Sequence, residues 1–149
     1  MHARPFVAGR SLYVLGHMGD LMVMRSDDWG ETWSEPVKLT EGETWHQAPC
    51  NVWYAHGNVY LVMERLTEPG FGGWPVHVLA PVVMAAREGD DLLAQEAWKF
   101  SNELSFRDVL ERHGWPNLIG VPFYEVGPQA PQHKADRRVM NPIGWLETN

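Results

Sequence analysis

The chain has 149 residues, of which 44% are hydrophobic and 21% charged, so it can bury a core and wholesale disorder is excluded. Twelve basic against nineteen acidic residues give a net charge of −7, so nucleic acid is not an expected partner. The single cysteine, Cys50, excludes an intrachain disulfide and a thiolate zinc cluster. No run of eighteen apolar residues and no signal-like N-terminal segment is present, so no membrane partner is expected and the compartment stays open.

The first forty residues predict a β-meander. Eight Trp, eleven Pro and fourteen Gly favour short strands joined by tight turns over a helical bundle. Residues 11–16 and 21–26 are β-prone runs on either side of a glycine-containing loop, 17–20, and predict a hairpin. A dense turn signal at 27–33 leads to a third short run at 36–39.

A second set of β-prone runs follows the first. These runs lie at residues 48–55, 59–64, 76–86 and 98–101. Gly57 can adopt the positive φ that a tight hairpin turn requires between the first two of them. A helical turn is expected at 90–97, with Asp90 or Asp91 accepting hydrogen bonds from its free backbone N–H groups. Four antiparallel strands in sequence order are the unit of a propeller blade.

The remainder of the chain does not continue this succession of short β-prone runs. Residues 104–144 hold one short amphipathic run and a proline-rich passage without clear periodicity. Such a long irregular insertion is uncommon in a compact domain, so it is either a functional loop or a segment that awaits a missing partner. Residues 145–149 look like the start of another strand, and the whole chain, 1–149, is interpreted as a single partial domain.

The most specific pattern is Ser26-Asp27-Asp28-Trp29-Gly30-Glu31-Thr32-Trp33. It fits Ser-x-Asp-x-Gly-x-Thr-Trp and resembles the Asp-box, or BNR repeat, of sialidase-like β-propellers. Ser26 and Asp28 can accept hydrogen bonds from the turn's backbone, Gly30 supplies a conformation closed to residues with a Cβ, and Trp33 can pack between sheets. In that family the box closes the turn between the third and fourth strands of a blade, away from the ligand. The structural residues of the box are then Ser26, Asp28, Gly30, Thr32 and Trp33.

The resemblance implies an all-β fold, a partial β-propeller of four-stranded antiparallel blades whose parent is six-bladed. It divides the chain into a blade with the Asp-box (11–39), a second blade (48–101), the long insertion (104–144) and the start of a further blade (145–149). Trp53 and Tyr54 are expected to pack between blades. Because a blade takes about 40 to 50 residues, a six-bladed ring needs upwards of about 240. The missing blades would come from a complementary chain or from self-association.

The resemblance also implies a function, the processing of glycans by a glycoside hydrolase-type site at the channel mouth. Sialidases depart from the usual pair of catalytic carboxylates. The family uses three arginines, an acid/base aspartate and a Tyr–Glu nucleophile pair, and this set is incomplete here. Asp20 is the acid/base candidate, with a structural alternative as a loop-end aspartate that accepts backbone N–H groups. Residues 145–149 are similar to the strand that carries the family's glutamate, which would be Glu147. Arg4-Pro5 is similar to the Arg-Ile-Pro signature of the first arginine, without its middle residue.

Propeller geometry predicts which loops share the ligand face. With 11–16 as a second strand, the candidate residues on this face are His17, Asp20, Trp45, His46, Glu64, Arg65, Trp74 and Glu147. Exposed aromatic rings stack on sugars, and charged groups bind hydroxyls or the carboxylate of an acidic sugar. In the alternative, Glu64 and Arg65 pair with each other, and His17 and His46 are polar loop residues without a role in proton transfer or metal binding. No cofactor and no metal are predicted.

Three functional hypotheses therefore compete. In the first, the chain is part of an exo-sialidase-like glycoside hydrolase, inactive alone because another polypeptide supplies the missing blades. In the second, it is a non-catalytic carbohydrate-binding module. In the third, copies of the chain assemble into a closed ring or swap strands, because two open blades leave unpaired edges and apolar faces uncovered. A carbohydrate ligand, in particular an acidic sugar, is the partner that these hypotheses share.

Overall fold

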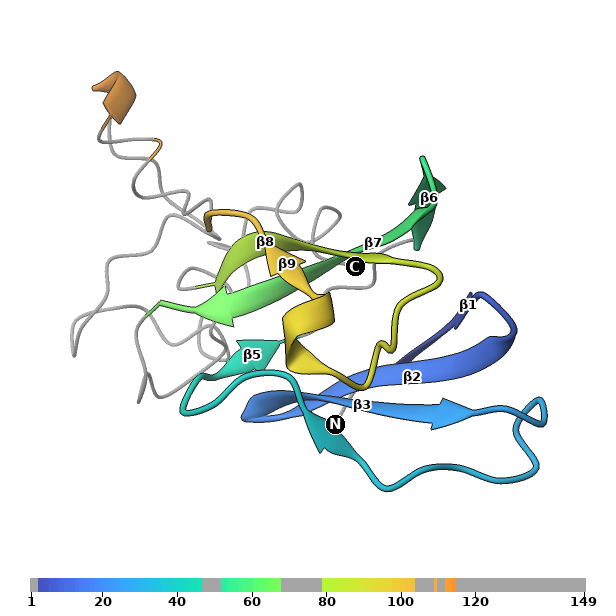
Figure 1. Ribbon diagram of the computed structural model, residues 1–149. Helices are drawn as coiled ribbons and strands as arrows, with labels where there is room; N and C mark the ends of the chain where they lie inside the picture. The colour runs from blue at the N-terminus through green and yellow to red at the C-terminus, as the bar shows by residue number, and fades with distance from the viewer. Residues whose placement is uncertain (1–2, 47–51, 68–78, 104–108, 110–111, 115–149) are drawn as a thin grey trace, which may run out of the picture.

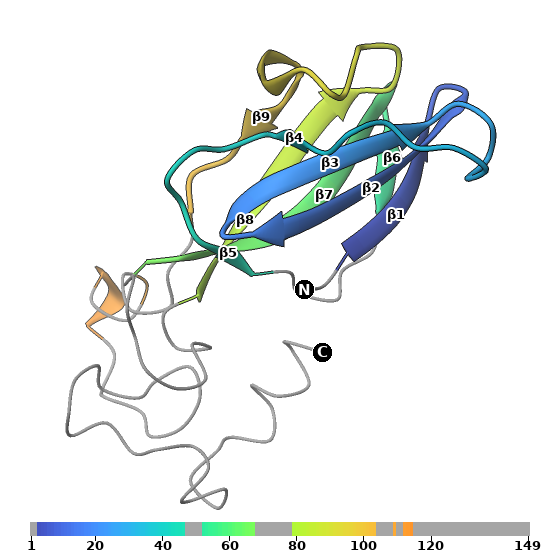
Figure 2. The ribbon, with the colours of Figure 1, turned by 90° about the horizontal axis from the view of Figure 1, so that it is seen from below.

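The computed structural model describes residues 3–46, 52–67, 79–103, 109 and 112–114. These residues form two antiparallel sheets that lie face to face (Figure 1), and Figure 2 shows one sheet in front of the other. The first sheet has the order β1-β2-β3-β4, and the second has the order β5-β7-β8-β9, with β6 paired to β7. The expected all-β fold is confirmed, and the described sheets do not close into a ring.

The first sheet contains the meander that the sequence predicts, with one strand more. Its strands are β1 (Ala3–Ala8), β2 (Ser11–Met18), β3 (Asp20–Ser26) and β4 (Val37–Lys38). The hairpin is tighter than expected, because pairing continues to Met18 and Asp20 and leaves only Gly19, at φ +85°, in the turn. The strand β1 was not predicted, because Pro5 argues against a strand. A proline is tolerated there because β1 forms the edge of the sheet.

The second sheet is built around one long hairpin. Its strands are β5 (Trp45–His46), β6 (Trp53–Ala55), β7 (Asn58–Leu66), β8 (Leu79–Arg87) and β9 (Lys99–Phe100). β7 and β8 pair along nine residues, from Asn58 opposite Arg87 to Leu66 opposite Leu79. Gly57 takes the predicted positive φ, +73°, next to His56 at +52°, as a two-residue hairpin turn requires. The strand β5 was not predicted, because its two residues are too few to show alternation.

The helical turn before β9 is shorter than predicted. Only Gln95–Ala97 form a helix, a single 3-10 turn, within the expected range 90–97. The side chain of Asp91 accepts a hydrogen bond from the backbone N–H of Leu93 at 3.2 Å, which is the kind of contact that the sequence predicted. Trp98 follows this turn and donates from its indole Nε1 to the carbonyl of Leu92 at 3.0 Å.

The core lies between the two sheets. Alternate residues of β1, β2, β3, β7 and β8 point inward and are buried: Phe6, Tyr13, Leu15, Leu21 and Val23 from the first sheet, and Val59, Leu61, Met63, Val82 and Met84 from the second. Phe6 stacks on Tyr13 with ring centroids 5.4 Å apart and meets the edge of Trp98 at 6.2 Å. Each such buried side chain contributes about 1.5–3 kcal/mol of hydrophobic stabilisation.

Several predicted features lie outside the described residues. They are Trp74, Glu147, Cys50, the strand start at 145–149 and most of the insertion 104–144. Among the residues that the structure describes, no helix is long and apolar enough to cross a membrane.

Candidate functional site

The loops of the two sheets gather at two opposite ends. At one end the β2–β3 turn meets the link between the sheets, because the backbone N–H of Trp45 donates to the carbonyl of Gly19 at 2.9 Å. The end of β7 joins them through a hydrogen bond from Leu66 to Thr44 at 2.8 Å. We call this region, residues 17–20, 39–46, 64–67 and 101–103, the β2–β3 end. The opposite end, which contains the β1–β2 turn and residues 26–36, is the β1–β2 end.

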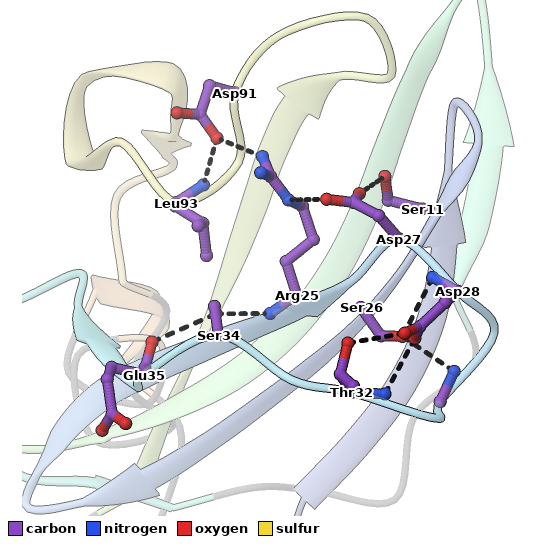
Figure 3. Close-up of polar contacts among 11 residues, drawn as sticks. Ser11, Arg25, Ser26, Asp27, Asp28, Thr32, Ser34, Glu35, Asp91 and Leu93 are labelled. Atoms are coloured by element: carbon purple, nitrogen blue, oxygen red, sulfur yellow. Dashed lines mark hydrogen bonds and ion pairs between the residues drawn. The ribbon is translucent and has the colours of Figure 1, made fainter.

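The 26–33 turn, at the β1–β2 end, is closed by its own side chains (Figure 3). Ser26 Oγ accepts a hydrogen bond from the Gly30 N–H at 2.7 Å and donates to Asp28 Oδ1 at 2.7 Å. Asp28 also accepts from the N–H of Thr32 at 2.8 Å and from its hydroxyl at 2.5 Å. These bonds from Thr32 lower the pKa of Asp28 to about 2. Ser26 and Asp28 thus make the backbone contacts that the sequence pattern predicts.

Gly30 and Trp33 behave differently from each other in this turn. Gly30 has the predicted positive φ, at +101°. The prediction that Trp33 packs between the sheets is wrong, because Trp33 is 37% exposed and is not part of the core between the sheets. Its indole Nε1 donates to the carbonyl of Gly30 at 3.1 Å, which folds the ring back over the turn. A Cβ added at Gly30 would lie 3.8 Å from this ring, an ordinary van der Waals distance, so the positive φ and not the indole is what favours glycine at this position.

An ion-pair bridge joins the two sheets at the β1–β2 end (Figure 3). Arg25 of β3 lies 3.2 Å from a carboxylate oxygen of Asp27 and 3.2 Å from one of Asp91, which belongs to the second half of the chain. Because both carboxylates are largely exposed, each pair adds little stability. The bridge connects the β8–β9 link to the first sheet.

Asp20, at the β2–β3 end, is engaged by the link between the sheets. It is only 8% exposed, and Oδ1 accepts from the Glu43 N–H at 3.0 Å and from the Thr40 hydroxyl at 3.3 Å. Oδ2 accepts from Lys38 Nζ at 3.0 Å. The backbone hydrogen bond from Glu43 and then the bond from Lys38 lower the pKa of Asp20. A carboxylate that is ionised at neutral pH is a poor proton donor, so this geometry favours the structural alternative over the acid/base role.

Trp45 does not present its ring to solvent. It is 4% exposed, its ring centroid lies 5.9 Å from that of Phe100, and its indole Nε1 donates to Glu43 at 2.9 Å. A sugar-stacking residue needs an accessible ring face, and at this end Phe100 is the more exposed of the two. Phe100 was not predicted as a site residue, because one aromatic residue in a two-residue strand carries no distinctive pattern.

Arg65 is paired, but not with its neighbour in sequence. Its guanidinium donates to Glu103 at 2.7 Å and to Glu43 at 3.0 Å. The suggested pair between Glu64 and Arg65 is therefore wrong, because successive residues of a strand point to opposite faces. No sequence signal linked Arg65 to Glu103, since the two residues lie on different strand ends far apart in the chain.

A groove of about 720 Å³ runs beside this network. Its walls come from the link between the sheets and from the end of β9, and they include Glu41, Glu43, Trp45, Phe100 and Glu103. Arg65 contributes the positive charge of the lining, between the two carboxylates that it binds.

Two histidines and a buried glutamate meet across the two sheets. The β5–β7 register places His46 opposite Glu64, and the two side chains lie 3.0 Å apart between Nδ1 and Oε2. The ring of His17, from β2, has its centroid 6.0 Å from that of His46. A carboxylate beside an imidazole orients the ring and is an arrangement used in proton transfer. Within the described residues no group of three or more His, Cys, Asp or Glu side chains is placed to hold a metal ion.

Arg4 lies at the same end of the first sheet. The β1–β2 register places it opposite Leu15, at the start of β1 and close to the end of β2 that carries His17. Its Nε is buried and has no hydrogen-bond partner within the described residues. A buried donor without an acceptor costs about 1–3 kcal/mol, so Arg4 retains unused hydrogen-bonding capacity within the described residues.

The structure thus brings six of the eight predicted ligand-face residues to one end, and the other two lie outside the described residues. The six are His17, Asp20, Trp45, His46, Glu64 and Arg65. Searches with models of protein families, among curated proteins and among solved structures gave no match. The family resemblance therefore depends on residues 26–33 and on the order of the strands.

Proposed function

We propose that the chain contributes two blades to a sialidase-like propeller that recognises acidic glycans at the β2–β3 end. The observation that carries this proposal is the 26–33 turn, whose side chains and backbone form a closed set of hydrogen bonds. The turn connects β3 to β4, the third and fourth strands of the first sheet. This is the position that the Asp-box occupies in a blade, and it leaves the opposite end for the ligand.

The groups at the β2–β3 end suit an acidic sugar. Arg4 offers a guanidinium with a buried Nε that has no acceptor within the described residues, and arginine binds carboxylates through two parallel hydrogen bonds. His46 and Glu64 provide further donors and acceptors for hydroxyl groups, and His17 lies next to them. This combination supports an anionic polyhydroxylated ligand such as a sialic or uronic acid.

Binding without turnover is the activity that the described residues support best. Asp20, the candidate acid/base group, already accepts three hydrogen bonds, from Lys38 of β4 and from Thr40 and Glu43 of the link between the sheets. Hydrolysis of a sialoside is the second candidate, and the partly buried His46–Glu64 pair favours it because a carboxylate-oriented imidazole can move a proton. In that case Glu64 takes part in the chemistry, together with blades supplied by a complementary chain.

Binding of the full chain to sialylated, uronic-acid-containing and neutral oligosaccharides, followed by NMR, tests the proposal. We expect Arg4→Ala to abolish binding of the acidic sugars, because it removes the carboxylate partner. Arg87→Ala is the matched control, since Arg87 is an exposed arginine at the far end of β8. Absence of binding by the folded chain, or equal losses in the two variants, would contradict the proposal. Release of sialic acid from a fluorogenic sialoside, lost in Glu64→Gln, would establish the second candidate.

A further inference from the structure

The second sheet has apolar side chains on the face that points away from the first sheet. In β7 and β8 the buried residues alternate with an outward set, and the register places Tyr60 opposite Ala85 and also opposite Trp53 of β6. Trp53 is 68% exposed and Val83 is 41% exposed. The second-sheet outer face is defined here by Trp53, Tyr60, Pro81, Val83 and Ala85.

The first sheet repeats this arrangement on its own outward side. Its inward residues, such as Leu15 and Val23, are fully buried, and the residues between them are also apolar. The register pairs Val7 with Leu12 and Val14 with Met24, so these side chains share one face. The first-sheet outer face is defined here by Val7, Leu12, Val14, Met22 and Met24, all of them partly exposed.

Apolar outer faces are not expected in a two-layer protein. An antiparallel sheet with one face in water alternates apolar inward with polar outward residues. In these sheets the outward residues in the middle of the strands are apolar, and the polar ones of the second sheet, Asn58, Glu64 and Arg87, lie toward the strand ends. Large apolar patches on a soluble protein mark interaction surfaces. Among the described residues, only the inner faces are covered by the opposite sheet. Both sheets therefore have the composition of layers inside a longer stack.

We propose that the second-sheet outer face of one copy docks on the first-sheet outer face of the next. Within the chain, one face of the first sheet already packs on one face of the second. The two uncovered faces are the first-sheet outer face and the second-sheet outer face. When the first of these in one copy packs on the second in another copy, the pairing of first sheet on second sheet that exists within the chain is repeated between chains. Such a contact is heterologous, and it closes into a ring when the rotation between copies permits.

The size of the ring follows from the number of sheets. Propellers contain about 4–8 blades, so about two to four copies of a chain with two sheets would close one. This inference uses the strand arrangement of the proposed function but does not depend on glycan binding. A chain that assembles without binding any glycan would support it, and a monomer that binds acidic glycans would overturn it.

The experiment is light scattering coupled to size exclusion on the full chain. We expect a mass that is an integer multiple, two or more, of 17.0 kDa. Met24→Lys on the first-sheet outer face and Val83→Lys on the second should each reduce the mass to that of the monomer. Glu35→Lys is the matched control, because it places a lysine on an exposed loop outside both faces. We expect it to leave the assembly unchanged.

Mixing the two lysine variants distinguishes this interface from a symmetric one. Each variant keeps one intact face, so the mixture should form a dimer of twice 17.0 kDa, although each variant alone is monomeric. A monomeric wild-type chain with cooperative unfolding overturns the proposal and indicates that residues of the same chain cover the faces. An assembly that only one substitution disrupts, or that neither disrupts, also overturns it. If a lysine variant loses its circular dichroism spectrum, Met24→Gln and Val83→Thr replace it in the same comparison.

Discussion

The backbone N–H of Glu43 donates a hydrogen bond to Asp20 Oδ1 at 3.0 Å, which ties the start of β3 to the link that leads into the second sheet. Lys38 of β4 and Thr40 of the link bind the same carboxylate, so one side chain contacts both the end of the first sheet and the link that follows it. Asp20 therefore connects the two sheets at the end where the candidate ligand residues gather.

Replacement of Asp20 by Asn is expected to lower the urea midpoint of unfolding at pH 7. The amide loses the ion pair with Lys38 and turns a donor toward groups that are themselves donors. Because the pKa of Asp20 is lowered in the folded chain, its stabilising contribution is present above the ordinary pKa of 3.8 and is lost as the pH falls below it. Asp90→Asn, an exposed aspartate beyond β8, is the control and should leave the midpoint unchanged. Equal urea midpoints for the wild type, Asp20→Asn and Asp90→Asn would show that the contacts of Asp20 with the link do not stabilise the fold.

Asp28 predicts a second pH dependence, at the other end of the sheets. Its pKa is about 2 in the folded chain against an ordinary value of 3.8. A depressed folded pKa stabilises the protein above about pH 4, and this stabilisation disappears as the pH falls toward 2. Asp28→Asn should therefore be less stable than the wild type at pH 7, with a difference that shrinks between pH 4 and pH 2. Urea unfolding at pH 7, 4 and 2.5 measures this, and a constant difference across that range would refute the assignment.

Gly30 and Gly89 form a matched pair of glycines for a backbone test. Gly30 has a φ of +101°, whereas Gly89 lies outside the left-handed region with no atom within 4 Å of an added Cβ. Gly30→Ala should destabilise the chain by about 1–3 kcal/mol, because a residue with a Cβ is strained at that φ. Gly89→Ala should be neutral or slightly stabilising. Denaturant unfolding of the two variants checks this, and similar losses in both would count against the turn geometry.

Phe6 tests whether β1 belongs to the core. It is buried between Tyr13 and Trp98, so Phe6→Ala should cost about 3–5 kcal/mol of unfolding free energy. Val37→Ala, on an exposed position of β4, should change stability by less than about 0.5 kcal/mol. A loss for Phe6→Ala as small as that for Val37→Ala would mean that β1 does not pack as described.

The sequence predicted the features that depend on local patterns. Runs of β-prone residues identified β2, β3, β7 and β8, and glycine identified the turn at Gly57. It also predicted that Ser26 and Asp28 bond the turn around Gly30, because all the partners lie within eight residues. It missed β1, since Pro5 interrupts the pattern of a strand, and β5, since two residues show no period.

The contacts of the candidate site were less predictable. The strand order predicted that His46 and Glu64 lie at the same end of the sheets, and they do. Their direct contact could not be predicted, because it depends on the register between β5 and β7, and β5 itself was not predicted. Arg65 finds Glu43 and Glu103 rather than its neighbour Glu64, because the direction of a side chain outweighs its proximity in sequence. Burial of Trp45 likewise depends on Phe100, which reaches it from β9.

The strand order of the first sheet has a consequence for how the chain folds. Each of β1, β2, β3 and β4 pairs with the strand that follows it, so every pairing closes a short loop. Short closures carry a small entropic penalty and are associated with fast folding. All four strands lie before Leu39, so their pairing requires no residue of the second sheet. The strands of the first sheet can therefore begin to pair during synthesis, before the second half of the chain has been made. The hairpin of β7 and β8 can then pack on the inner face of the first sheet.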